Sequence, residues 1–159
     1  MTIQTDPIFS NHYTDPIFSN HYKVYINHTD AGGIVYHANH LTFFENCRRD
    51  WLTSLGFDGY FFDTDGTADG TDGQQGKVHF VVSRADLTYK LPLLVDDNLV
   101  VTIADVVKKS ASLIMTQHIY RSDDDFNHGK VATTGVITLA CVMNSEHGIR
   151  PCRLPMAFR

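Results

Sequence analysis

The chain has 159 residues, of which 43% are hydrophobic and 19% charged, the balance of one globular domain large enough to bury a core. A formal net charge of −5, with no basic stripe to offset the acids, excludes a nucleic-acid binder. Cys47, Cys141 and Cys152 show no metal-type spacing and indicate reduced thiols of a cytoplasmic protein. The N-terminal region contains Asp6 and Asp15 and no long apolar run, so we expect neither a signal peptide nor membrane insertion.

The chain begins with a perfect tandem repeat: residues 5–13 read TDPIFSNHY, and residues 14–22 repeat them. A solenoid needs at least about three structural repeats, so the duplication does not indicate a repeat fold. We expect residues 1–20 to form an N-terminal extension and residues 21–159 to form one domain.

A strand and a helix are predicted next, from the spacing of their apolar residues. Tyr22, Val24 and Ile26 alternate and predict a half-buried strand over residues 21–27. Asn39 is expected to cap the following helix and Gly56 to end it. The apolar residues that predict this amphipathic helix recur at steps of three and four: Leu41, Phe44, Trp51, Leu52 and Leu55.

Residues 58–76 are dominated by aspartate and glycine without periodicity, which is typical of a mobile surface loop. The acidic residues raise the question of a calcium site. Counted from Asp65, however, the EF-hand pattern fails, because Thr67 occupies its third position and Gly76 its twelfth. A solvated loop is therefore the favoured interpretation.

The rest of the chain is expected to be strands, with a bulge near residues 81–83, a polar hairpin loop over residues 123–129 and a short tail from Arg150. A strongly apolar helix beside one antiparallel sheet is best covered when the sheet wraps around it. We therefore expect an α+β fold with a five-stranded antiparallel sheet around one long helix. Four of its strands are predicted here: residues 78–91, 99–107, 113–119 and 131–143.

The residues with chemistry gather between the first strand and the helix, where residues 28–40 read HTDAGGIVYHANH. The backbone must turn sharply here, and Gly32 and Gly33 permit that turn. Unpaired N–H groups at the start of the helix would then face Asp30, and such a pair can polarise and attack a carbonyl group. Aspartate is also a common capping and turn residue, and the spacing alone leaves both readings open.

This stretch resembles the signature of the 4-hydroxybenzoyl-CoA thioesterase family, and specifically its YbgC-type branch of acyl-CoA thioesterases. The resemblance extends over about residues 22–155, apart from the Asp/Gly loop. It implies a hot-dog fold, acyl-CoA hydrolysis without metal or cofactor, and homodimers that often pair into tetramers. Later segments agree with it in order: Phe80-Val81-Val82 with Tyr89, Asp96-Asp97, Ser112-Leu113 with Thr116-Gln117, and Arg150-Pro151 with Leu154-Pro155.

The resemblance maps the family's aspartate onto Asp30 and its catalytic histidine onto His37. Asp30 would attack the thioester carbon to give a mixed anhydride, or would activate water, and the sequence leaves both routes open. His37 would orient Asp30 or the water, or protonate the departing thiolate. The alternative for His37 is a packed surface histidine. Main-chain amides near Tyr36 and His37 are the expected donors to the thioester oxygen.

Other residues are assigned to substrate or weighed as metal ligands. Gly33, Val35 and Tyr36 are expected to contact the acyl thioester. A metal site made of His28, Asp30, His37 and His40 is the less favoured alternative, since the family implied by the resemblance uses none. The phosphates of coenzyme A are expected to be held by Lys108, Lys109, Arg150 and Arg153. The alternative is that these basic turn residues are only solvated.

Competing functions remain open. A hot-dog dehydratase or hydratase would show a His-rich stretch with Pro and Gly, or an Asp and a His five residues apart in an Asn-Pro context. Here Asp30 and His37 are seven residues apart with no proline between them. A non-catalytic acyl-thioester-binding module would not need Asp30 beside the helix start. Acyl-carrier-protein thioesters remain possible substrates, and the preferred acyl chain is left open.

Overall fold

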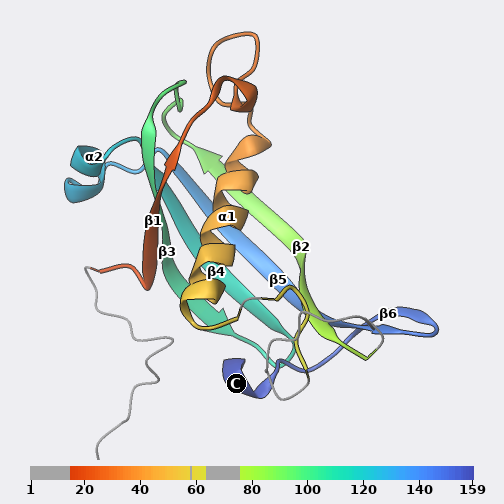
Figure 1. The fold of residues 1–159 in the computed structure, drawn as a ribbon. Helices are drawn as coiled ribbons and strands as arrows, with labels where there is room; N and C mark the ends of the chain where they lie inside the picture. Colours follow the sequence, from red (N-terminus) through yellow and green to blue (C-terminus); the bar gives the residue numbers. More distant parts are fainter. Residues whose placement is uncertain (1–14, 58, 64–75) are drawn as a thin grey trace, which may run out of the picture.

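The computed structural model describes residues 15–57, 59–63 and 76–159, to which every structural statement below refers. Figure 1 shows one long helix lying across one face of a twisted sheet. The elements follow in the order β1 (Phe18–Lys23), the 3-10 helix η1 (Ile26–His28), α1 (Asn39–Ser54), β2 (Val78–Tyr89), β3 (Asn98–Lys108), β4 (Ser112–Tyr120), α2 (Asp123–Asn127), β5 (Thr133–Ser145), β6 (Gly148–Pro151) and the 3-10 helix η2 (Met156–Phe158).

The described strands form one antiparallel sheet in the order β1-β3-β4-β5-β2, and β6 pairs with the end of β5. Helix α1 packs against β1 and β3. The predicted α+β hot-dog architecture is confirmed, with six strands in place of the five expected. None of the described helices is long and apolar enough to cross a membrane.

Helix α1 supplies the centre of the core, because Phe43, Phe44, Cys47 and Trp51 are all at most 2% exposed. In β5, Gly135 makes room for this helix: a Cβ atom there would come within 2.6 Å of the Phe44 ring. A strand glycine at such a close approach is required by packing. The amphipathic helix predicted from the three- and four-residue steps is therefore confirmed, and it sits directly on the sheet.

The two ends of α1 differ in how well they were predicted. Gly56 has a φ of 91° just beyond the last turn, as expected for a glycine that ends a helix. At the start, the capping residue is Ala38 and Asn39 is already helical, so the predicted Asn39 cap is wrong. The Asn39 side chain instead donates to the His28 carbonyl at 2.8 Å, which ties the helix start to η1.

The first strand lies earlier in the chain than residues 21–27. The Ile17 amide already donates to the Ile103 carbonyl at 2.8 Å, and β1 continues to Lys23. The expected boundary after residue 20 therefore cuts through an edge strand of the sheet. Ile26 is 75% exposed, since the chain has turned into η1 by that point. The first repeat copy, residues 5–13, lies outside the described residues.

The remaining strands follow the predicted pattern, with local differences. The register shift of β2 between Val82 and Arg84 confirms the predicted bulge. The expected loop over residues 123–129 contains the short helix α2, because the Ser122 hydroxyl caps it by accepting from the Asp125 amide at 3.1 Å.

The expected tail from Arg150 is also corrected. Gly148 has a φ of 103° and makes a tight turn that returns the chain along β5 as β6. Most of the Asp/Gly loop, including the calcium reading at Asp65, lies outside the described residues. Within its described part, Phe62 is fully buried and pairs with Val78.

Candidate active site

The segment between η1 and α1 forms a tight turn that exposes Asp30. The Gly33 amide donates to the Asp30 carbonyl at 3.1 Å, and the φ of Gly33, 78°, lies in the left-handed region that favours glycine. The Gly32 amide donates to Asp30 Oδ1 at 2.7 Å, and a Cβ atom at Gly32 would lie 3.1 Å from that oxygen. The two glycines therefore fix the Asp30 carboxylate against the turn, with Oδ2 bonded to none of the described residues.

A pocket of about 340 Å³ opens beside this turn. Its walls come from the turn, the entry to α1, and the end of β2 with the segment that follows it. The polar lining residues include Asp30, His37, His40 and Tyr89, and apolar lining residues include Ile34, Val35, Leu91 and Leu93. The two residues predicted to be catalytic, Asp30 and His37, thus line one pocket.

The main-chain amides at the helix entry are not equivalent. The Tyr36 amide donates to the His28 carbonyl at 2.9 Å, so the expectation that it faces the substrate is wrong. Among the described residues, the His37 amide donates no main-chain hydrogen bond. The Tyr89 hydroxyl donates to the His37 carbonyl at 3.0 Å and so holds this stretch of backbone from the far side of the pocket. An unpaired, fixed amide is suited to hold a developing oxyanion.

His40 is a pocket residue that the sequence singled out only as a possible metal ligand. It is 4% exposed, its Nδ1 lies 3.0 Å from Thr133 Oγ1, and its ring meets the Tyr89 ring edge-on at 4.8 Å. Burial is the main reason that the pKa of His40 is lowered to about 4; a backbone hydrogen bond with Val35 opposes this shift, and nearby His37 adds to it. His40 is therefore neutral at pH 7. No local sequence signal identifies Thr133 or Tyr89 as its neighbours.

His28 faces away from this pocket. Its Nδ1 accepts from the Tyr25 amide at 2.9 Å, and its ring packs against Phe43 with 4.9 Å between centroids. In the part of the chain that the structure describes, histidine, cysteine, aspartate and glutamate side chains form no group of three or more that could hold a metal ion.

The three residues expected to contact the acyl thioester differ in where they lie relative to the pocket. Val35 is 3% exposed and lines the pocket, and Gly33 shapes the turn next to it. Tyr36 is 46% exposed, and its ring packs on the His37 ring at 4.3 Å instead of lining the pocket.

The expected phosphate-binding residues largely gather in a different pocket, of about 290 Å³. Lys108, Lys109 and Arg153 line it together with Arg159, which the sequence reasoning missed, whereas Arg150 in β6 does not. Leu93, in the pocket at Asp30, lies shortly before the start of β3. From that start, at Asn98, β3 runs about 34 Å to Lys108. Figure 1 accordingly has the turn before α1 at one end of the molecule and the C-terminus at the other. A single chain does not bring these cations beside Asp30.

Comparison with known families and proteins gives consistent matches. The family model described as "Thioesterase-like superfamily" matches residues 24–159. The acyl-CoA thioesterase YbgC of Haemophilus influenzae is 32% identical over 100 residues, which are 63% of this chain and 66% of the relative. The acyl-CoA thioester hydrolase YbgC of Escherichia coli O6:H1 is 30% identical over 106 residues, which are 64% and 68% of the two chains. This chain thus spans about two thirds of the length of these curated relatives.

Solved structures also share the architecture. A probable thioesterase from Bartonella henselae is 27% identical with a TM-score of 0.63, over 86% of this chain and 96% of that one. A gentisyl-coenzyme A thioesterase is 23% identical with a TM-score of 0.67, over 87% and 97%. The second likeness concerns the fold alone.

Proposed function

Because the chain belongs to the thioesterase-like superfamily, we propose that it is an acyl-CoA thioesterase, which hydrolyses a thioester to a free acid and coenzyme A. The observation that carries this proposal is the pocket at the turn before α1. There Asp30 and His37 line one cavity, and the His37 amide, which donates to none of the described main-chain carbonyls, lies at the same helix entry. The names of the YbgC relatives support the same reaction.

In the proposed reaction, the thioester carbonyl enters this pocket with its oxygen at the His37 amide. Asp30 then attacks the carbonyl carbon through its carboxylate, or removes a proton from a water molecule that attacks. Either route places negative charge on the carbonyl oxygen, which the amide stabilises. Coenzyme A leaves as a thiolate, and the His37 side chain orients the nucleophile or protonates that thiolate.

The active form is proposed to be a homodimer joined along β2. Among the described strands, β2 has β5 as its one neighbour. Its other edge is bonded to Phe62 at Val78, and further along the strand it is exposed, with Val82 at 47% and Tyr89 at 48%. A long exposed edge strand is a site for pairing with another chain. Antiparallel pairing of two β2 strands would continue the sheet and give the open pocket at Asp30 a second wall. Two such dimers could pair into a tetramer.

The same dimer gives the basic pocket a role. Two-fold pairing turns the second chain end for end, so its Lys108, Lys109, Arg153 and Arg159 come to the end of the assembly where the first chain has Asp30. Arg150 of the second chain, on β6 near the start of β2, comes to the same end of the assembly. We propose that these cations hold the phosphates of coenzyme A across the interface. An acyl-carrier protein, whose single phosphate reaches less far, would use them less.

A screen of thioester hydrolysis tests the proposed function. The full chain is incubated with coenzyme A thioesters from acetyl to palmitoyl, with benzoyl-CoA and with 3-hydroxybutyryl-CoA, and all products are separated by chromatography. We expect free coenzyme A and free acid from at least one substrate. Absence of hydrolysis throughout, or conversion of 3-hydroxybutyryl-CoA to an enoyl-CoA in place of hydrolysis, would contradict the proposal.

A further inference from the structure

Two cysteine thiols meet where β6 runs back along β5, and the site described above uses neither of them. Cys141 lies in β5 and Cys152 directly follows β6, so the turn at Gly148 brings the two residues together. Their sulfur atoms are 3.4 Å apart, and the Cys152 amide donates to the Cys141 carbonyl at 3.0 Å. Both cysteines are free in this structure, so the two thiols are in contact but not bonded.

The backbone at this contact suits a disulfide. Val142 and Pro151 are direct partners in the register of β5 and β6, so Cys141 and Cys152 are the next residues that face each other. Such residues on antiparallel strands have Cα atoms about 4.5–5.5 Å apart, and a disulfide spans about 4.4–6.8 Å. The sulfur atoms need to come only about 1.4 Å closer to reach the bonded distance of about 2.05 Å. Adjustment of the side chains is therefore enough to form the bond.

The two thiols differ in their access to solvent. Cys152 is partly exposed, whereas Cys141 is fully buried and its Sγ donates to the Arg153 carbonyl at 3.3 Å. Burial is the main reason that the pKa of Cys141 is raised; the hydrogen bond with Cys152 adds to this shift, and nearby Arg159 opposes it. A small oxidant therefore meets Cys152 first. Cys141 lies behind it, in the position of a thiol that resolves an oxidised neighbour.

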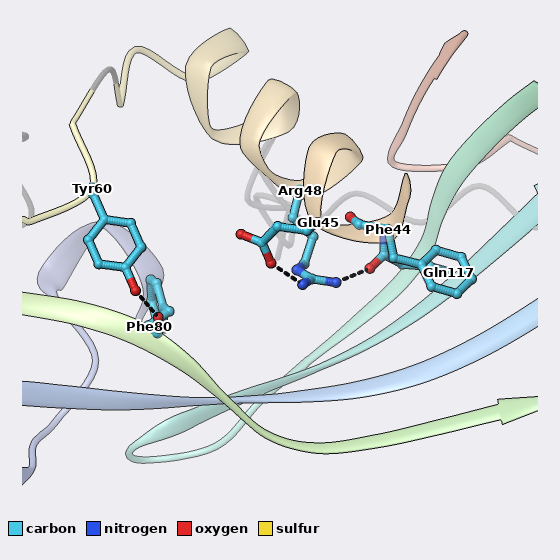
Figure 2. A network of polar contacts seen from close by, with 6 residues as sticks. All are labelled: Phe44, Glu45, Arg48, Tyr60, Phe80 and Gln117. Atoms are coloured by element: carbon cyan, nitrogen blue, oxygen red, sulfur yellow. Dashed lines mark hydrogen bonds and ion pairs between the residues drawn. The ribbon is translucent and has the colours of Figure 1, made fainter. Parts of the chain in front are cut away.

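Cys47 provides a comparison within the same chain. It is fully buried in α1, and its thiol donates to the Val101 carbonyl at 3.5 Å. The next residue, Arg48, is 4% exposed and donates to Gln117 Oε1 at 2.8 Å, so bonded polar side chains close this part of the helix (Figure 2). Burial is also the main reason that the pKa of Cys47 is raised to about 12. This thiol is thus shielded from an oxidant in the folded chain.

We infer that Cys141 and Cys152 form a redox-sensitive site, in which a hydroperoxide oxidises the two thiols to a disulfide that fixes the C-terminal segment to β5. The residues after Cys152 contribute Arg153 and Arg159 to the basic pocket, so that part of the pocket is then joined covalently to the sheet. The inference does not depend on the reaction at Asp30.

The oxidation proceeds in two balanced steps. With hydrogen peroxide, the Cys152 thiolate attacks one oxygen, so that an S–O bond forms, the O–O bond breaks and the released hydroxide takes up the proton lost by the thiol. Cys152 is then a sulfenic acid. The Cys141 sulfur attacks the Cys152 sulfur, an S–S bond forms, the S–O bond breaks, and hydroxide leaves with the Cys141 proton as a second water molecule. The two thiols lose two electrons, and the peroxide gains them.

The test adds a small molar excess of hydrogen peroxide to the reduced full chain, from which the reductant has been removed. The chain is then unfolded, its remaining thiols are labelled with iodoacetamide, and tryptic peptides are mapped by mass spectrometry. Because proline follows Arg150, residues 131–153 form one peptide that contains both Cys141 and Cys152, while Cys47 lies in another. We expect the first peptide to lose two hydrogen atoms and take no label, and Cys47 to be labelled as in the untreated chain.

Two variants separate the steps. In Cys141→Ser, Cys152 should stop at the sulfenic acid, which dimedone traps. In Cys152→Ser, Cys141 should keep its label under the same treatment, because the exposed partner is missing. Equal oxidation of Cys141 with and without Cys152 would contradict the assigned order.

Oxidation of the wild type should also raise the melting temperature by about 5 °C, because the disulfide restricts the unfolded chain. Dithiothreitol should reverse the rise, and Cys152→Ser treated with peroxide is the matched control and should show none. Full labelling of both cysteines after peroxide, equal loss of label at Cys47, disulfides between chains in place of one within the chain, or an unchanged melting temperature would overturn the inference. The peptide map of the wild type decides the matter even where a variant fails to fold.

Discussion

His37 contributes its backbone amide and its side chain separately. Replacing it with alanine removes the imidazole but keeps the amide at the entry to α1. We expect His37→Ala to lower kcat by about 10- to 100-fold, because coenzyme A is a fair leaving group and needs only moderate acid assistance. Steady-state hydrolysis measures the effect, and His128→Ala, at the C-terminal cap of α2, is the matched control. A loss larger than that of Asp30→Asn would reverse the roles assigned to the two residues.

His40 makes the stability of the fold depend on pH. Burial holds its pKa at about 4 in the folded chain, below the value of about 6.5 in an unfolded chain, so the unfolded state binds the extra proton. The stabilisation from neutral His40 is complete above pH 6.5 and is lost as the pH falls toward 4, by up to ~3 kcal/mol. Melting temperatures of the wild-type chain should therefore fall more steeply over this range than those of His40→Gln. Parallel curves would contradict the expectation.

For individual residues, contacts between sequence neighbours in the site could be predicted, whereas contacts between residues far apart in sequence could not. The turn at Asp30 depends on Gly32 and Gly33, which are its neighbours in sequence. The pairing of His40 with Thr133 spans 93 residues, and it exists only because the sheet brings β5 under α1. The bond that occupies the Tyr36 amide was missed for the same reason, since it depends on how η1 approaches the helix.

Among the elements, β1 is formed almost entirely by the second copy of the N-terminal repeat. Because the two copies are identical, deletion of residues 5–13 and deletion of residues 14–22 give the same shorter chain. That chain still contains the sequence of β1. We therefore expect unchanged melting temperature and activity, measured by thermal unfolding and acyl-CoA hydrolysis.

The control is removal of both copies, which deletes most of β1 with the half-buried Phe18 and Tyr22. This change should lower the melting temperature, since β3 loses one of its two partner strands. A melting temperature lowered by several degrees after removal of a single copy would show that the extra copy contributes to the fold.

Periodicity is the reason why some elements were predicted and others were not. Helix α1 and strands β2 to β5 are each nine residues or longer, so each has enough residues for its apolar pattern to be recognised. Strand β6 has four residues, all exposed, and α2 has five, so neither offers a pattern to read. Strand β1 was placed late because Ile26 continues its alternation in sequence but not in space.

For the whole molecule, the proposed dimer requires that two β2 strands meet near their centres. Ala85 lies near the middle of this exposed edge, and Ala85→Glu would place like charges opposite each other in the dimer. We expect light scattering to give about twice the chain mass of 17.9 kDa for the wild type and a smaller mass for the variant.

Val107→Glu is the matched control, because Val107 is also exposed but lies on β3, inside the sheet. This variant should keep the wild-type mass. Dilution of the wild type should also lower its specific activity once the dimer dissociates. Full activity of a monomer at nanomolar concentration would exclude a shared site.

The central claim is that the Asp30 carboxylate performs acyl-CoA hydrolysis, and Asp30→Asn tests it most directly. The substitution preserves the shape of the side chain and its bond from the Gly32 amide but removes the charge needed for attack or proton abstraction. With the best substrate of the screen, we predict a fall in kcat of at least about 100-fold with an unchanged melting temperature, whereas Asp123→Asn in α2 keeps the wild-type rate. Turnover by Asp30→Asn close to that of the wild type would contradict the account.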